Sequence, residues 1–159
     1  ANGGAIYNHA AAQNLDAFLA LGNGVQIYNN RAIGTDLTSG RGGGIYNAEF
    51  ATLSINGAII TYNTSLKEGG GVFTEGNAEL QATSVQYNQA LDASRGRGGA
   101  IYVRRGTTRV VADNLVSGNI ARSVGNGIVR AAGGNASVTI NPDADNEIPD
   151  GYVNDPNPV

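Results

Sequence analysis

One short motif recurs along the chain and constrains its fold more than any other feature. The motif is a glycine pair or its near equivalent, then a small or branched apolar residue and usually an aromatic. Its copies are Gly3–Asn8, Gly42–Asn47, Gly69–Thr74, Gly98–Val103 and a decayed one at Gly125–Arg130. Successive copies begin 27 to 39 residues apart. A fixed period of this size is typical of repeat proteins, in which each unit buries its apolar face against the next.

A second mark lies later in each unit. It is an apolar residue, two variable residues, an asparagine, one further residue, and then Ala or Ser. The asparagines of its four copies are Asn30, Asn63, Asn88 and Asn119. Segments of alternating apolar and polar residues, such as Leu53-Ser54-Ile55, separate the two marks and predict short strands with one buried face.

These patterns predict an all-β fold, a right-handed parallel β-helix. We expect a single solenoid of about five coils over residues 1–140, because a unit of about 27 residues suits short strands joined by turns. The glycines allow a positive φ, or a close approach of backbone, at a corner that every coil must turn. Equivalent Ile and Val residues, including Ile45, Val72 and Ile101, should stack into a common interior column.

Composition excludes several functions. Charged residues make up 14% of the chain and the net charge is −3, whereas nucleic-acid binding needs clustered cations. No apolar run is long enough for a transmembrane helix. The chain has no Cys and no Met, so we expect neither disulfides nor thiolate metal sites, and we expect a processed module of a longer protein.

The asparagines of the second mark should also stack. Asn30, Asn63, Asn88 and Asn119 predict an amide ladder at one corner, each side chain bonding the next and the local backbone. The alternative is a polar binding track.

A column of aromatic residues follows the inward Ile and Val positions. By strand alternation Tyr7, Tyr46, Phe73 and Tyr102 should point outward, where they could stack on sugar rings or only stabilise neighbouring strands. Tyr62 and Tyr87 form a shorter pair with the same two interpretations.

The first unit carries about twelve extra residues. Within residues 9–21, Ala10, Ala11, Ala12, Leu15, Phe18 and Leu19 have helical character. This composition predicts a short helix or a loop that bulges from the coil and covers the N-terminal end. His9 has no evident acid or nucleophile nearby in the sequence and is interpreted as a surface residue.

The repeat marks resemble those of polymorphic outer-membrane proteins and related autotransporter passengers. The resemblance covers roughly residues 2–130, and the phrase from Gly42 to Asn47 followed by Ala51–Ile55 is similar to repeats of pectin-lyase-like bacterial surface proteins. It implies export, a bacterial outer-membrane or extracellular location, and adhesion. The chain has Ile or Val three residues before each ladder asparagine, where the polymorphic repeats usually have Phe.

Residues 141–159 break the pattern and hold all four prolines, which argues against a further regular coil. Their acidic spacing resembles a degenerate thrombospondin type 3 repeat, which implies Ca²⁺ ligands at Asp143, Asp145, Glu147 and Asp150. The alternative is a solvated acidic linker.

No catalytic constellation recurs in the repeats. Acidic residues fall at different phases, and the arginines at 95, 97, 104, 105 and 109 have no matching carboxylate column in the sequence. We therefore expect a structural or adhesive surface module that presents a rigid face to a carbohydrate or a cell-surface protein, with no required cofactor apart from the calcium option. The alternatives are a carbohydrate-binding or carbohydrate-cleaving β-helix, or a filament subunit that self-associates end to end.

Overall fold

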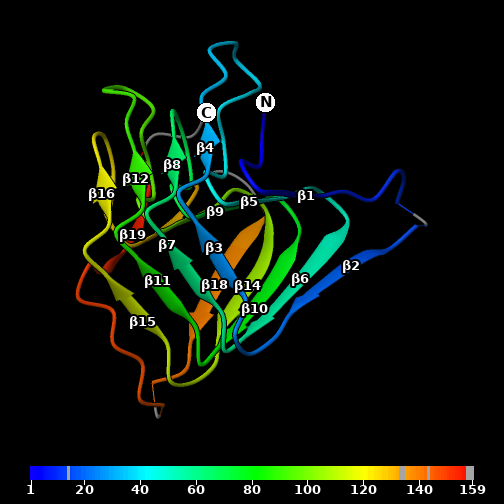
Figure 1. Cartoon of the computed structure of the whole chain (residues 1–159), viewed down its shortest axis with the longest axis vertical. Coiled ribbons are helices and arrows are strands. Elements are labelled where there is room, and N and C mark those ends of the chain that lie inside the picture. The colour runs from blue at the N-terminus through cyan, green and yellow to red at the C-terminus, as the bar shows by residue number, and fades with distance from the viewer. Residues whose placement is uncertain (14, 133–134, 143, 157–159) are drawn as a thin grey trace.

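The protein is built of parallel β-sheets. The computed structural model describes residues 1–13, 15–132, 135–142 and 144–156. This part of the chain contains nineteen strands, no helix and four sheets (Figure 1).

The four sheets each collect strands from successive repeats, and all pairings are parallel. Sheet A contains β1 (Ile6–Asn8), β5 (Ile45–Asn47), β9 (Val72–Thr74), β13 (Ile101–Val103), β17 (Ile128–Arg130) and β19 (Tyr152–Asn154). Sheet B contains β2 (Ala17–Leu21), β6 (Ala51–Asn56), β10 (Asn77–Gln81), β14 (Gly106–Val110) and β18 (Ala136–Ile140). Sheet C contains β3 (Gln26–Tyr28), β7 (Ile59–Thr61), β11 (Ser84–Gln86) and β15 (Leu115–Ser117). Sheet D contains β4 (Arg31–Ala32), β8 (Thr64–Ser65), β12 (Gln89–Ala90) and β16 (Ile120–Ala121).

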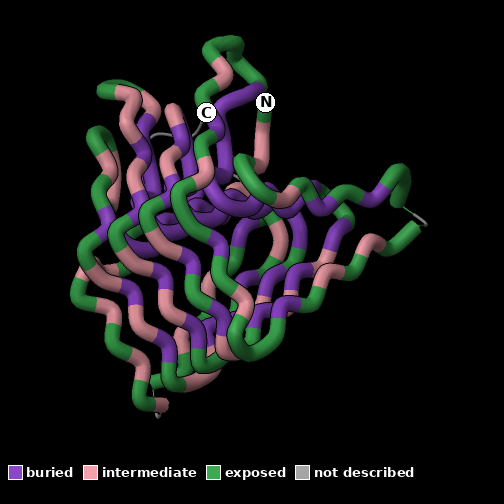
Figure 2. Tube along the Cα trace, viewed as in Figure 1, coloured by how far each residue is buried: buried purple, intermediate pink, exposed green. Residues whose placement is uncertain are grey.

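Equivalent positions of successive repeats stack in register, as the sequence predicts. Ile45 pairs with Val72, and Val72 pairs with Ile101. All three side chains are at most 1% exposed and belong to one core cluster. Buried and more exposed residues alternate along many of the strands (Figure 2), so that one face of these strands supplies the core. In sheet A, β5, β9 and β13 are buried at every position.

The paired glycines of the motif serve two separate needs. The first glycine of each copy has a left-handed backbone, with φ between +60° and +65° at Gly42, Gly69 and Gly98. The second has no room for a side chain: a Cβ on Gly70 would lie 2.2 Å from the carbonyl oxygen of Gly99. The motif therefore fixes a turn and a close approach of adjacent repeats at the same corner.

The helical interpretation of the first unit is wrong. Ala17–Leu21 forms strand β2, which pairs with β6 from Ala17–Ala51 to Leu21–Ile55. Ala and Leu favour helices only weakly, and here the paired backbone and the packing of Leu19 and Leu21 against the core outweigh that preference. The extra residues of this unit lie in the loops 9–16 and 33–44, of which residue 14 lies outside the described residues.

The tail lies against the last full repeat. Strand β19 pairs with β17, Glu147 bridges to Leu115, and Ile148 packs against the core cluster. The predicted calcium residue Asp143 lies outside the described residues.

Candidate binding face on sheet B

The outer face of sheet B presents two rows of side chains in register. One row runs Phe18, Thr52, Asn77, Thr107, Ser137, and the other runs Ala20, Ser54, Glu79, Arg109, Thr139. Strand alternation produces the rows, because the intervening residues of each strand face the core. The first row ends in a large exposed ring, since Phe18 is 67% exposed.

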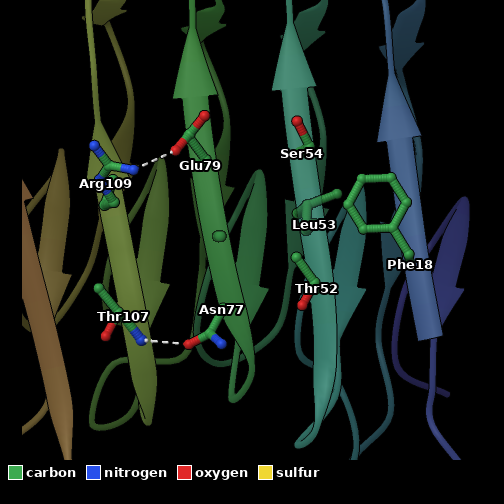
Figure 3. A pocket seen from close by; sticks show the side chains of 9 residues that line it. Phe18, Thr52, Leu53, Ser54, Asn77, Glu79, Thr107 and Arg109 are labelled. Atoms are coloured by element: carbon green, nitrogen blue, oxygen red, sulfur yellow. Dashed lines mark hydrogen bonds and ion pairs between the residues drawn. The ribbon is translucent and has the colours of Figure 1, made fainter. Parts of the chain in front are cut away.

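A shallow groove of about 370 Å³ follows these rows across four strands. Figure 3 shows Phe18 over β2 and β6 at one side of the groove, with polar side chains on the other strands. Glu79 and Arg109 form an ion pair of 2.8 Å, and the Asn77 side-chain oxygen accepts from the Thr107 backbone N–H at 3.0 Å. These contacts hold hydroxyl, amide and charged groups in fixed positions at the surface.

A second pocket of about 390 Å³ continues the groove at the corner where the chain enters sheet B. Its lining includes three carboxylates, Asp16, Glu49 and Glu75, together with Phe50. Phe50 is 41% exposed and has a left-handed backbone with φ of 64°. A bulky residue seldom adopts this conformation outside a tight turn.

Glu75 is a fully engaged carboxylate at this corner. Its Oε2 accepts a hydrogen bond of 2.5 Å from the Tyr46 hydroxyl, and its Oε1 pairs with Arg104 at 3.0 Å. Burial raises the pKa of the Tyr46 hydroxyl above its usual range, and the hydrogen bond to Glu75 adds to the effect. Tyr46 therefore acts as a hydrogen-bond donor that positions Glu75.

The arginine cluster, for which the sequence showed no matching carboxylate column, is paired with carboxylates in the structure. Three of them pair with Glu residues of earlier repeats: Arg104 with Glu75, Arg105 with Glu49, and Arg109 with Glu79. The other two pairs are Arg95 with Asp92 and Arg97 with Asp155. Glu79 and Arg109 are register partners of β10 and β14, and Glu75 and Arg104 directly follow the paired residues Thr74 and Val103. These two contacts therefore follow the repeat, and aligning the repeats strand by strand was the signal that could have found them.

The predicted asparagines lie in one continuous ladder. The backbone N–H and Nδ2 of Asn30 donate to Oδ1 of Asn63, which donates in the same way to Asn88 and then Asn119, at 2.8 to 3.0 Å. The residue before each rung has a positive φ, as at Tyr62 (55°). Asn63, Asn88 and Asn119 are at most 2% exposed, so these three rungs offer no open binding track.

The ladder continues into the tail. The backbone N–H and Nδ2 of Asn119 both donate to Oδ2 of Asp150 at 2.7 Å, and Oδ1 of Asp150 accepts from the Gly118 N–H at 3.0 Å. Two further ladders escaped the sequence analysis. Asn8, Asn47 and Thr74 form one at the last residues of β1, β5 and β9, and Thr83, Asn114 and Asn146 form the other between sheets B and C. The recurring Ile-Tyr-Asn of the first two motif copies was the available signal for the former.

The aromatic column stacks as predicted, but its expected exposure is wrong. Ring centroids are 5.0 Å apart for Tyr7 and Tyr46, 4.9 Å for Tyr46 and Phe73, and 5.9 Å for Phe73 and Tyr102. Only Tyr7 of the four is open, at 53%, whereas the other rings are at most 6% exposed.

The segments that lead into sheet A cover the rings. The Arg41 guanidinium lies 5.4 Å from the Phe73 centroid, and Val124 packs on the same cluster. Arg41 is held by Glu68 at 2.7 Å, and both side chains are nearly buried. The column is therefore a second core, and a sugar could reach only its Tyr7 end, where His9 stacks on Tyr7 at 5.5 Å.

The remaining predicted residues do not form a cation site in the described structure. Within the described ranges, no three His, Cys, Asp or Glu side chains gather closely enough to hold a metal ion. Asp145 and Glu147 are exposed, and Asp150 serves the asparagine ladder. Calcium binding stays a prediction.

Comparisons with known proteins give no relative. No protein-family model matches the chain, and no curated protein or solved structure shows significant similarity to it. The described part of the chain also contains no helix that could cross a membrane.

Proposed function

We propose that this chain is a right-handed parallel β-helix module of a secreted or cell-surface protein, and that it binds an extended partner along sheet B without catalysing a reaction. The chain visits sheets A, B, C and D in the same order in each of the first four repeats, from β1 to β16, which supports a single solenoid. Parallel strands connected in this way are almost always right-handed. The export and surface location rest on the repeat resemblance.

The observation that carries the binding proposal is the pair of in-register rows on the outer face of sheet B. Adjacent strands place equivalent side chains about 4.8 Å apart, so a linear polymer lying across the strands would meet similar groups repeatedly. Phe18 offers an apolar ring face, and Asn77, Glu79 and Thr107 offer donors and acceptors. Sugar rings need this combination, because they have apolar faces and hydroxyl edges. A carbohydrate chain is therefore the favoured partner, ahead of a cell-surface protein.

Binding to immobilised plant, algal and bacterial polysaccharides tests the proposal. Phe18→Ala should lower affinity at least about tenfold for a ligand that stacks on the ring, which corresponds to the order of 1.4 kcal/mol. Tyr28→Ala is the matched control, because Tyr28 is a similarly exposed ring of the first repeat on sheet C. Equal losses in the two variants, or binding by neither wild type nor variant across the panel, would contradict a carbohydrate site on sheet B.

Carbohydrate cleavage is the second candidate, favoured by the three carboxylates that line the corner pocket. The contacts of Glu49 and Glu75 weaken it, because Glu49 is already paired with Arg105, and Glu75 with Arg104 and the Tyr46 hydroxyl. Incubation with the same polysaccharides distinguishes binding from cleavage. New reducing or unsaturated ends that appear with the wild type and not with Asp16→Asn would establish an enzyme.

A further inference from the structure

The corner between sheets C and D carries two tyrosines where the backbone favours other residues. The residue before each ladder asparagine has a left-handed backbone, with φ between +54° and +67°. Asn29 and Gly118 hold the first and last of these places, and both residue types adopt this conformation readily. Tyr62 and Tyr87 hold the two central places, although a bulky side chain is strained there. The fold of the corner therefore does not account for tyrosine at these two positions.

The two rings form an exposed stack. Their centroids are 5.2 Å apart with an interplanar angle of 13°, and Tyr62 is 57% and Tyr87 47% exposed. A Cβ on Gly118 would lie 2.6 Å from two ring carbons of Tyr87, so the ring fills the space that a side chain would need there. Neither hydroxyl bonds to another residue in the described part of the chain. The ring faces that meet cover each other, and ring edges with their hydroxyls remain open to solvent.

A second stacked pair of tyrosines is enclosed, in contrast. Tyr7 and Tyr46 lie 5.0 Å apart, but Tyr46 is only 6% exposed and its hydroxyl donates to a carboxylate. The Tyr46 ring is also stacked on Phe73, so it cannot tilt toward Tyr7. Of the two pairs, only the one at the corner presents two phenols that are both accessible and able to tilt.

We propose that the Tyr62–Tyr87 pair is a site of oxidative cross-linking, at which a haem peroxidase with hydrogen peroxide joins the two rings as dityrosine. Each phenol loses one electron and its hydroxyl proton, which gives two phenoxyl radicals. The unpaired electrons spread to the ring carbons beside the hydroxyls, and one Cε–Cε bond forms between the rings. Each bonded Cε then releases its hydrogen as a proton while its oxygen takes one up, so both rings are phenols again. The two electrons and two protons removed overall reduce one hydrogen peroxide to two water molecules.

The register of the strands favours coupling within one molecule over coupling between molecules. Tyr62 and Tyr87 directly follow the paired residues Thr61 and Gln86 of β7 and β11, so the strand pairing holds the rings side by side. Groups held together in one chain meet at an effective concentration of millimolar or more, far above that of separate molecules in a micromolar solution. The product adds a covalent bond between the second and third repeats. It is independent of the proposed carbohydrate partner on sheet B.

Peroxidase treatment of micromolar protein tests the proposal. The expected product is a monomer that shows dityrosine fluorescence on a denaturing gel and is lighter than the untreated chain by two hydrogen atoms. Cleavage after Lys and Arg should then release residues 42–67, which contain Tyr62, joined to residues 68–95, which contain Tyr87. The urea midpoint of the cross-linked monomer should be raised, because a covalent link between distant residues restricts the unfolded chain.

Tyr62→Phe and Tyr87→Phe should each abolish the fluorescence of the monomer, because phenylalanine keeps the ring and cannot form the phenoxyl radical. Tyr28→Phe is the matched control. Tyr28 is also 57% exposed, but within the described ranges no tyrosine stacks on it, so this variant should give as much fluorescent monomer as the wild type. The proposal would be overturned by dityrosine confined to covalent dimers, by its absence from the treated wild type, or by equal monomer fluorescence in Tyr62→Phe and Tyr28→Phe.

Discussion

Asn88 accepts and donates within the corner ladder. Its Oδ1 accepts from the backbone N–H and Nδ2 of Asn63, and its own Nδ2 donates to Asn119 and to the carbonyl of Ile60. The side chain is fully buried, so truncation leaves donors without water or partner. Asn88→Ala should lower the free energy of unfolding by about 3 kcal/mol.

The end of the same ladder provides the control for this variant. Asn30 is half-buried and donates to Asn63, but the structure gives its side chain no donor from an earlier rung within the described residues. Asn30→Ala should therefore cost about 1 kcal/mol. Urea unfolding measures both variants, and equal losses would show that the rungs are not coupled through burial.

Tyr102 makes stability depend on alkaline pH. Burial, reinforced by the nearby Asp155 carboxylate, raises the pKa of its hydroxyl to about 12. The folded state therefore favours the neutral phenol. Its contribution to the free energy of unfolding is complete below the unfolded pKa of about 10 and is lost as the pH rises from there through about 12. Tyr102→Phe should flatten the decline of the urea midpoint across this window. Some slope should remain, because the pKa of Tyr46 is raised as well. An unchanged slope would contradict the assignment.

At the scale of the element, the stacked column of sheet A behaves as a core. Phe73 has no exposed surface and lies between Tyr46 and Tyr102. Phe73→Ala should cost about 3 to 5 kcal/mol in unfolding free energy, because it removes a ring and leaves a cavity. Tyr7→Ala, at the open end of the same column, should cost about 1 kcal/mol. Thermal unfolding of the pair measures the difference, and similar losses would mean that the column is solvated.

The sequence predicts the strongest repeating features and misses most of the contacts made by segments that occur once. The similar spacing of Ile45, Val72 and Ile101 within the recurring glycine motif indicates their stacking, and the recurring asparagines indicate the ladder. Strand β2 was mistaken for helix because Ala and Leu favour a helix locally, whereas its neighbour β6 decides its conformation. The cover over Phe73 was missed because Arg41 comes from a segment of irregular sequence, which carries no period. The outer rows of sheet B can be predicted from the alternation of buried and exposed residues along its strands. The groove beside them also needs Phe18, and the Ala- and Leu-rich composition of that segment indicated a helix instead of strand β2.

At the scale of the whole molecule, the tail packs on the last full repeat through Asp150, which joins the asparagine ladder. Asp150 accepts three hydrogen bonds, from the Gly118 N–H, the Asn119 N–H and Asn119 Nδ2. Asn119 is 2% exposed, so its donors cannot turn to water once the carboxylate is removed. Asp150→Ala should therefore lower the unfolding free energy by about 2 to 3 kcal/mol.

Comparing Asp145→Ala with Asp150→Ala distinguishes a tail that stabilises the ladder from one that is only an acidic linker. Asp145 is an exposed carboxylate of the same segment, so its removal should change the unfolding free energy by less than about 0.5 kcal/mol. If the segment acts only as a linker, both variants unfold like the wild type. If it holds calcium, both lose a chelator-sensitive part of their melting temperature, because a ligand bound only to the folded state raises stability. If the tail stabilises the ladder, Asp150→Ala alone should lose unfolding free energy, and a chelator should not change that loss. Asp150 accepts hydrogen bonds from the ladder residue Asn119, and no such contact is expected of Asp145.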